Sequence, residues 1–209
     1  MTGPTHRQYS ICFAYITLML FYTIGVHNIN YYMSIPIVLM AAKAGALFPD
    51  VDHSWSNVRD KTVINKIINT LIHITGGKHR SWQTHSLDIC VAYSLASWLV
   101  PNILYSNGIV SMMNKEVMLL LLTGFASGWI SHMVADMLTS DGVRLFFWCK
   151  FKVKLVPKKI GPLRFNTGHE WEAFNYKLMK ISGIVLGIIC IIYPLITSGV
   201  IDKLVQNLQ

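Results

Sequence analysis

Long apolar runs separated by polar segments dominate the pattern along the chain. Five runs stand out, at residues 9–26, 31–48, 85–105, 117–138 and 178–200. A transmembrane helix needs roughly 20 mostly apolar residues, with a range of about 17–25. All five runs reach that range, the first two at its short end. The pattern therefore predicts an all-α membrane protein with about five transmembrane helices, rather than a soluble bundle of buried core helices.

Two longer polar segments interrupt the runs. Within the first, "VINKIINTLIHI" (63–74) places apolar residues on one helical face, which predicts an amphipathic helix at the membrane surface. Within the second, "KFKVKLV" (150–156) alternates lysine with apolar residues. Period two favours a strand, and we expect one arm of a small β-hairpin that turns at residues 157–161.

Composition supports a membrane protein. Apolar residues make up 53% of the 209 residues and charged residues only 13%, whereas soluble domains carry about 25% charged residues. The net charge of +8 would indicate nucleic acid in a soluble protein. In a membrane protein the positive-inside rule explains it, so we expect no nucleic-acid partner. The chain is long enough for one sizeable domain, and we expect a single membrane-embedded domain over residues 1–209.

The basic residues also predict an orientation. Five spans put the N-terminus and residues 49–84 and 139–177 on one side. Of the 18 Lys and Arg, Lys115 and Lys203 lie on the other side, and Lys43 lies inside the second run. The basic side of a multi-pass protein is cytoplasmic. We therefore expect the two polar segments in the cytoplasm.

The glycines and cysteines say less about function than the charged residues do. The pairs Gly124/Gly128 and Gly183/Gly187 have the G-x-x-x-G spacing that suits close packing of membrane helices. The four cysteines show no C-x-x-C spacing. Most lie in apolar runs, where a cysteine is usually a small buried hydrophobe, so neither a disulfide nor a thiolate metal site is expected.

Histidines and acids gather at the predicted cytoplasmic ends of the runs. The residues are His6; Asp50, Asp52 and His53; His79 and His85; His132 and Asp136; and His169, Glu170 and Glu172. Helix packing would bring these clusters, which are distant in sequence, to one membrane boundary. Ionisable groups at such a boundary are costly and usually functional.

The local spacings favour a metal site. His132 and Asp136 are four residues apart and share a helix face. Asp50 and Asp52 would point the same way in an extended segment. Imidazole and carboxylate together suit zinc, manganese or iron. Alternatively, the first pair is an ordinary helix-surface pair, and the aspartates simply form a turn after a helix stop.

The motifs "LFPDVDH", "HRSWQTHS", "GWISHMVADMLTSDGV" and "TGHEWE", in that order, resemble the YdjM family. Its members are described as LexA-binding, inner-membrane-associated, metal-dependent hydrolases. The resemblance covers residues 5–175 and implies a location in a bacterial inner membrane. This chain has one residue more between its two motif histidines than the usual H-R-G-x-T-H-S. The His-x-x-x-Asp helix is also similar to those of zinc-dependent phospholipase C and related nucleases, which implies several zinc ions and phosphoester substrates.

The resemblance also implies a set of site residues. The expected metal ligands are His6, Asp50, Asp52, His53, His79, His85, His132 and Asp136. The family pattern further marks Arg80, Thr84, Ser86, Thr139, Gly142 and Glu172. We expect Thr84, Ser86 and Thr139 to orient ligands or cap helices.

These residues lead to a mechanistic hypothesis. Two or three divalent metal ions, zinc favoured, would activate a water that attacks a phosphoester. Arg80 would bind the phosphate, and Glu172 would be a ligand or a general base. Lys150, Lys152 and Lys154 would contact anionic lipid headgroups, which favours a lipid or lipid-linked substrate. Two alternatives stay open: a regulatory protein with a structural metal, and an ion transporter.

Overall fold

The computed structural model describes residues 2–24, 29–52, 63–77, 82–144, 146–149, 151–155 and 170–197. The helices are α1 (Gly3–Thr23), α2 (Tyr31–Gly45), the short 3₁₀ helix η1 (Pro49–Asp52), α3 (Val63–Ile74), α4 (Trp82–His85), α5 (Leu87–Ser106), α6 (Met112–Met137) and α7 (Glu170–Thr197). His53, His79, Arg80 and Lys150 lie outside the described residues, as does the predicted turn at 157–161.

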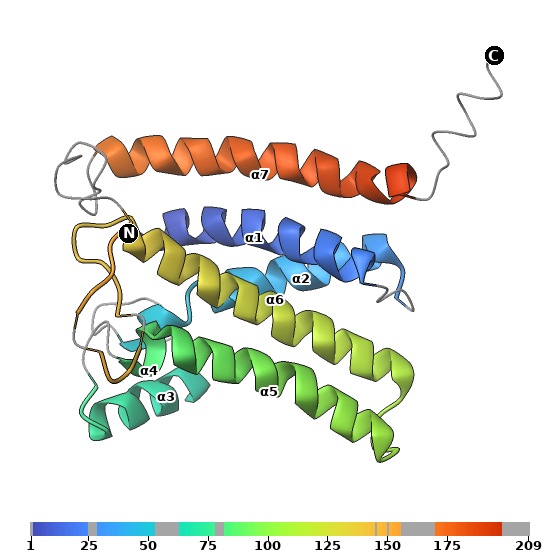
Figure 1. Ribbon diagram of the computed structural model, residues 1–209, viewed down its shortest axis with the longest axis horizontal. Helices are drawn as coiled ribbons and strands as arrows, with labels where there is room; N and C mark the ends of the chain where they lie inside the picture. The colour runs from blue at the N-terminus through green and yellow to red at the C-terminus, as the bar shows by residue number, and fades with distance from the viewer. Residues whose placement is uncertain are drawn as a thin grey trace.

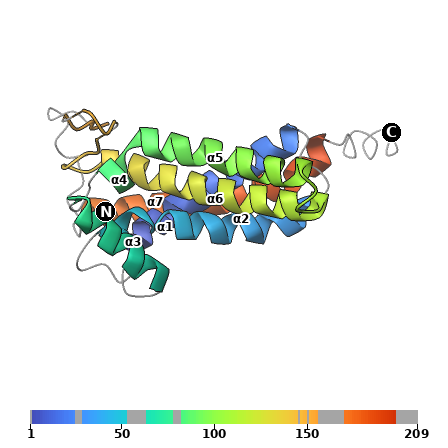
Figure 2. The same cartoon turned by 90° about the horizontal axis from the view of Figure 1, so that it is seen from below.

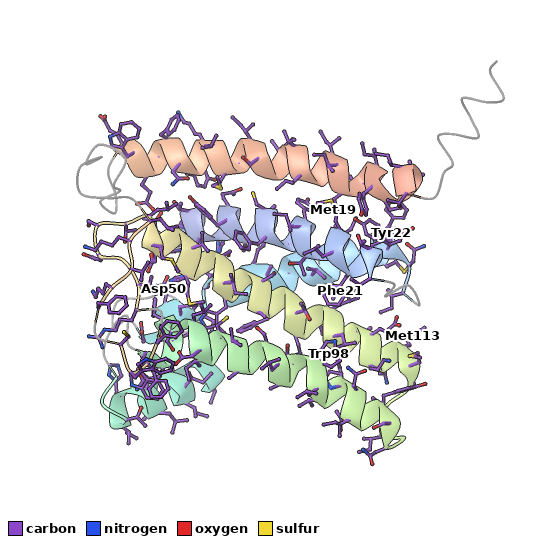
Figure 3. The ribbon with its side chains drawn as sticks, viewed as in Figure 1. Met19, Phe21, Tyr22, Asp50, Trp98 and Met113 are labelled. Atoms are coloured by element: carbon purple, nitrogen blue, oxygen red, sulfur yellow. The ribbon has the colours of Figure 1, made fainter. Side chains whose placement is uncertain are left out.

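The long helices lie side by side in a bundle, and the short ones gather at one end of it (Figures 1 and 2). α1 contacts α2, α6 and α7, while α5 packs on α6. The N-terminus of α1 lies at the same end as α3 and α4 (Figure 1). Asp50 also lies at this end, whereas Tyr22 and Met113 lie toward the opposite end (Figure 3). The fold thus brings residues that are distant in sequence together at one end of the bundle.

In the part of the chain that the structure describes, four helical segments are long and apolar enough to cross a membrane: Tyr31–Asp52, Leu87–Ser106, Met112–Met137 and Glu170–Thr197. The exposed apolar side chains on α5 and α7, such as Leu95 and Ile184, suit contact with lipid. α1 is not among the four, because its first turns carry polar residues, including Thr5, Arg7 and Gln8. The fifth predicted span therefore stays a prediction.

The two polar segments differ in how far they match expectation. α3 covers the predicted amphipathic stretch, and Ile67 and Leu71 are exposed on it while Ile72 is buried. In the second segment the described residues form no named strand. They contain a single antiparallel bridge between Val143 and Val153. The hairpin predicted from the lysine alternation is therefore not confirmed.

Glycines allow α2 and α6 to pack closely. A Cβ added to Gly128 would lie 1.9 Å from the carbonyl oxygen of Ala42, and one added to Gly45 would lie 2.0 Å from that of Phe125. The Gly124/Gly128 pair thus serves close packing, as its spacing predicted. The contact fixes the end of α2, and with it η1, against α6.

Candidate metal centre

Five titratable side chains meet at the end of the bundle where the short helices gather. They are His6 from α1, Asp50 from η1, His85 from α4, and His132 and Asp136 from α6. His6, His85, His132 and Asp136 are at most 1% exposed. Burying so many ionisable groups costs free energy unless they are paired or bind a metal.

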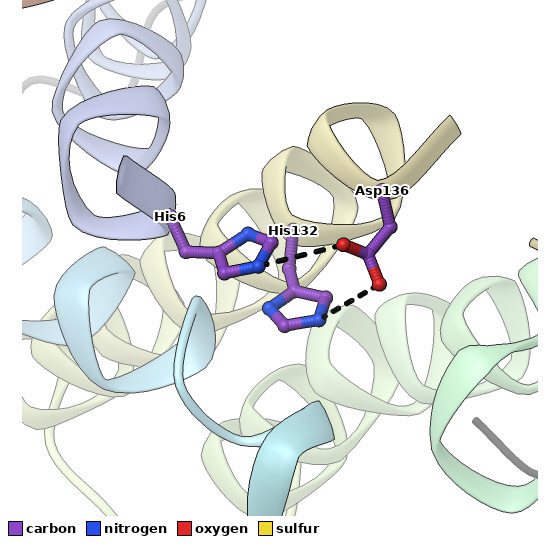
Figure 4. A group of neighbouring side chains, drawn as sticks. All are labelled: His6, His132 and Asp136. Carbon is purple, nitrogen blue, oxygen red and sulfur yellow. Dashed lines mark ion pairs between the residues drawn. The ribbon is translucent and has the colours of Figure 1, made fainter. Parts of the chain in front are cut away.

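Asp136 lies at the centre of the cluster. Its Oδ1 is 3.5 Å from Nε2 of His6. Its Oδ2 is 3.8 Å from Nε2 of His85 and 3.7 Å from Nε2 of His132. Figure 4 shows one carboxylate oxygen directed toward His6 and the other toward His132. The two oxygens therefore face different imidazoles.

Asp50 completes the cluster from η1. Its Oδ1 lies 3.8 Å from Nε2 of His132, and its side chain is 23% exposed. Among the described residues, two sets of three side chains have ligand atoms within 4.8 Å of one another: His6, His132 and Asp136, and Asp50, His85 and His132. Asp50 is the member of these sets that reaches toward solvent.

These distances suit coordination better than hydrogen bonding. Nitrogen–oxygen hydrogen bonds are about 2.7–3.2 Å long. Two ligand atoms each about 2.0–2.2 Å from one zinc ion lie roughly 3.0–3.8 Å apart. Nε2 of His132 is buried and makes no hydrogen bond within the described part of the chain. The residues therefore fit a divalent cation placed between them.

The far sides of two imidazoles are held by other groups. Nδ1 of His132 lies 2.7 Å from the carbonyl oxygen of Ala46. Because a carbonyl only accepts, Nδ1 carries the proton, and Nε2 of the neutral ring offers a lone pair to the cluster. Nδ1 of His85 lies 2.9 Å from the Thr84 hydroxyl, which donates to Asp52. Histidines that bind metals usually have such partners behind them.

The structure separates Asp50 from Asp52, which the sequence placed on one side of an extended segment. Residues 49–52 form a 3₁₀ helix, in which positions two apart point in different directions. Asp50 faces His132, whereas Asp52 lies behind His85, with Oδ2 3.4 Å from Nδ1. The extended geometry was wrong. Asp52 belongs to neither ligand set of the described residues.

Glu172 also lies outside both ligand sets. Its Oε1 accepts hydrogen bonds from the backbone N–H and hydroxyl of Thr2 and from the hydroxyl of Thr5. A carboxylate at the N-terminus of a helix is favourable because it meets unsatisfied N–H groups and the positive end of the helix dipole. Glu172 therefore ties α7 to the first turn of α1, next to His6.

The smaller predicted residues have local partners. Ser86 occupies the N-cap position of α5, but its hydroxyl donates to the carbonyl of Trp82 rather than capping the helix. The Thr139 hydroxyl donates to the backbone carbonyl of Asp136. Gly142 has φ of 65°, and a Cβ there would lie 2.5 Å from the carbonyl oxygen of Val153. A glycine is thus required beside the bridge.

Two supporting groups were not predicted. The Trp129 indole donates to the carbonyl of Thr84 and so ties α4 to α6. Trp129 lies three residues before His132, on a similar face of the helix, and that spacing was the available signal. The backbone carbonyl of Ala46 has no signature in the sequence. Of the expected ligands, His53 and His79 lie outside the described residues, as does Arg80.

Comparison with known proteins places the chain in a family. The sequence model of the YdjM inner membrane protein family matches residues 1–203, which is nearly the whole chain. The chain belongs to the YdjM family of inner membrane proteins. The family resemblance seen in the sequence motifs is thereby confirmed.

A curated relative is similar over a shorter stretch. The uncharacterized protein YvsG of Bacillus subtilis (strain 168) is 27% identical over 141 residues, which cover 66% of this chain and 71% of that protein. No solved structure matches the chain.

Proposed function

We propose that this YdjM family member is a membrane-embedded, metal-dependent hydrolase. Its substrate would be a phosphoester in a lipid or lipid-linked molecule at the cytoplasmic membrane face. The observation that carries the proposal is the buried meeting of three imidazoles with Asp50 and Asp136, at distances that suit shared metal ligands. Buried ionisable side chains that converge in this way are typical of functional sites.

The geometry favours two cations. Asp136 offers Oδ1 to the His6 side of the cluster and Oδ2 to the side of His85 and His132. With two cations bound, Asp136 would be a ligand on both sides of the cluster. Neutral imidazole and carboxylate donors favour zinc, with manganese or iron as alternatives.

When bound, such cations supply a nucleophilic water near neutral pH and a Lewis acid for a phosphoryl oxygen. The residues of the chain would do the rest. Thr84 and the Ala46 carbonyl hold the imidazoles in place from behind. The partly exposed Asp50 marks the side from which a substrate would enter. Arg80 would bind the phosphate as a two-pronged donor. Because Glu172 accepts hydrogen bonds from Thr2 and Thr5, we assign it to the contact between α7 and α1 rather than to the role of a base.

The location supports a lipid substrate. The site lies at one end of a bundle with four candidate membrane spans, so we place it at the headgroup level. α1 would be the fifth span, since it packs between α2, α6 and α7. Lys152 is exposed and would contact anionic headgroups, whereas Lys154 donates to the carbonyl of Ser140. Position at a bundle end also argues against a transporter, whose ion sites lie near the midplane.

One observation favours a structural metal instead. His85 and His132 are 0% exposed, and structural sites are closed, with no open position for water. The same cluster would then stabilise the end of the bundle without catalysis. Only an activity assay distinguishes the two functions.

The decisive assay is release of phosphate or headgroup from phospholipids and lipid-linked phosphates, with and without a chelator. His132→Ala should lose metal and activity together. Arg80→Ala should keep its metal and lose rate by on the order of 10²-fold, as for other lost electrostatic donors. Chelator-insensitive turnover, or no turnover of any substrate, would favour the structural role.

A further inference from the structure

A cleft between α1 and α2 is lined by two basic side chains. Its volume is about 370 Å³, and Arg7 on α1 and Lys43 on α2 contribute to its walls together with Gln8 and Leu47. Among the described residues, no Asp or Glu lines this cleft, and neither basic residue forms an ion pair. Two cations without a counter-charge repel one another and attract an anion.

An apolar groove continues from this cleft. It lies between α1 and α7, has a volume of about 350 Å³, and shares Gln8 and Ile11 with the basic cleft. Its walls include Ile184 and Ile188, and Lys180 lines it as well. Figure 1 shows α7 running alongside α1.

Glycines on α7 help to form the groove. Gly183 and Gly187 line it, and a Cβ on Gly187 would lie 3.1 Å from the Tyr15 hydroxyl. Because these positions lack side chains, α7 approaches α1 closely and leaves a furrow between the flanking isoleucines. The glycine pair therefore serves both helix packing and the shape of the groove.

We propose that the cleft and the groove together bind one anionic phospholipid. Its phosphate would lie between Arg7 and Lys43, and an acyl chain would follow the groove between α1 and α7. Basic pockets between membrane helices on the cytoplasmic side are typical sites for anionic headgroups. The apolar continuation along the candidate span Glu170–Thr197 favours a lipid over a free phosphate.

This lipid site is separate from the metal centre. His6 is 1% exposed and faces the cluster, whereas the next residue, Arg7, is exposed. Neighbouring residues on a helix point about 100° apart, so α1 presents one side to the metal centre and another to the lipid. The inference does not depend on hydrolysis or on metal binding.

The test is lipid binding to delipidated protein in neutral detergent, followed by native mass spectrometry. Dioleoyl phosphatidylglycerol is titrated against dioleoyl phosphatidylcholine, with glycerol phosphate as a chainless competitor. We expect the anionic lipid to bind at least about tenfold more tightly than the zwitterionic one. Glycerol phosphate should not displace it at equal concentration. Equal binding of both lipids, or displacement by glycerol phosphate, would overturn the proposal.

Variants locate the site. Arg7→Gln/Lys43→Gln should weaken phosphatidylglycerol binding roughly 30-fold, since each basic residue near the membrane surface contributes about a fivefold factor. The matched control, Lys66→Gln/Lys177→Gln, removes the same charge from exposed positions outside both clefts and should bind as the wild type does. Equal losses in both variants would reduce the effect to net charge. Asp136→Ala should keep lipid binding, which separates this result from failure of the metal proposal.

Discussion

His6 and His132 stack face to face, with ring centroids 3.7 Å apart and ring planes inclined by 13°. The two imidazoles come from different helices, yet both direct Nε2 toward Asp136 (Figure 4). Two stacked, buried imidazoles repel each other when both are charged. The arrangement therefore favours neutral rings, which is the form that binds metals.

The first prediction concerns Asp136, whose carboxylate faces three histidines. We expect the purified wild type to contain about one to three divalent ions per chain, since roughly four to six ligands serve each ion. Asp136→Ala should lose most of this metal. Elemental analysis by mass spectrometry measures the content. Metal-free wild type, or unchanged content in the variant, would contradict the shared site.

The second prediction concerns the group behind His85. Thr84→Val removes the hydroxyl that lies between Asp52 and His85. It should retain metal but bind it about 10- to 100-fold more weakly, as is usual when a partner of a metal-bound histidine is lost. Competition with a coloured chelator measures the affinity. Thr70→Val is the control, because that exposed hydroxyl donates to the backbone carbonyl of Lys66 within α3. Equal affinity in both variants would exclude the positioning role.

The third prediction concerns the contact between α2 and α6. Gly128→Ala would place a Cβ 1.9 Å from the Ala42 carbonyl. Overpacking of this kind destabilises by about 1–3 kcal/mol, and the displaced α2 should also weaken metal binding through Asp50. Thermal unfolding in detergent gives the stability. Gly3→Ala is the control, since the nearest described neighbour of its Cβ is the Leu47 side chain, at an ordinary contact distance of 3.5 Å. A Gly128→Ala protein as stable as this control would refute the packing argument.

The fourth prediction concerns orientation. In a background without cysteines, Thr75→Cys after α3 and Asn107→Cys after α5 place thiols at exposed positions at opposite ends of α5. If the metal-centre end is cytoplasmic, an impermeant thiol reagent applied to intact cells should label Asn107→Cys and spare Thr75→Cys. Labelling after lysis should reach both. The reverse pattern in intact cells would invert the topology.

The sequence determined the features that depend on local periodicity and residue type. Apolar runs fixed where most long helices lie, and the period of residues 63–74 fixed α3, because a helix repeats every 3.6 residues whatever its neighbours are. The spacing of His132 and Asp136 likewise placed both on one face of α6. The glycine pairs marked where helices pack closely, since a missing Cβ permits contact in any partner arrangement.

Tertiary structure alone decided what each ionisable group faces. Because η1 is a 3₁₀ helix, Asp50 and Asp52 face different partners. The spacing of two residues in the sequence does not by itself determine this difference. Glu172 lies in the motif "TGHEWE" and was expected to be a ligand or a base. Its carboxylate instead meets the N-terminus of α1, because α7 packs there. The Ala46 carbonyl reaches His132 only because Gly128 lets α2 approach α6. A side chain's partner depends on interhelical distance and turn geometry, and both are set by packing between segments that are distant in sequence.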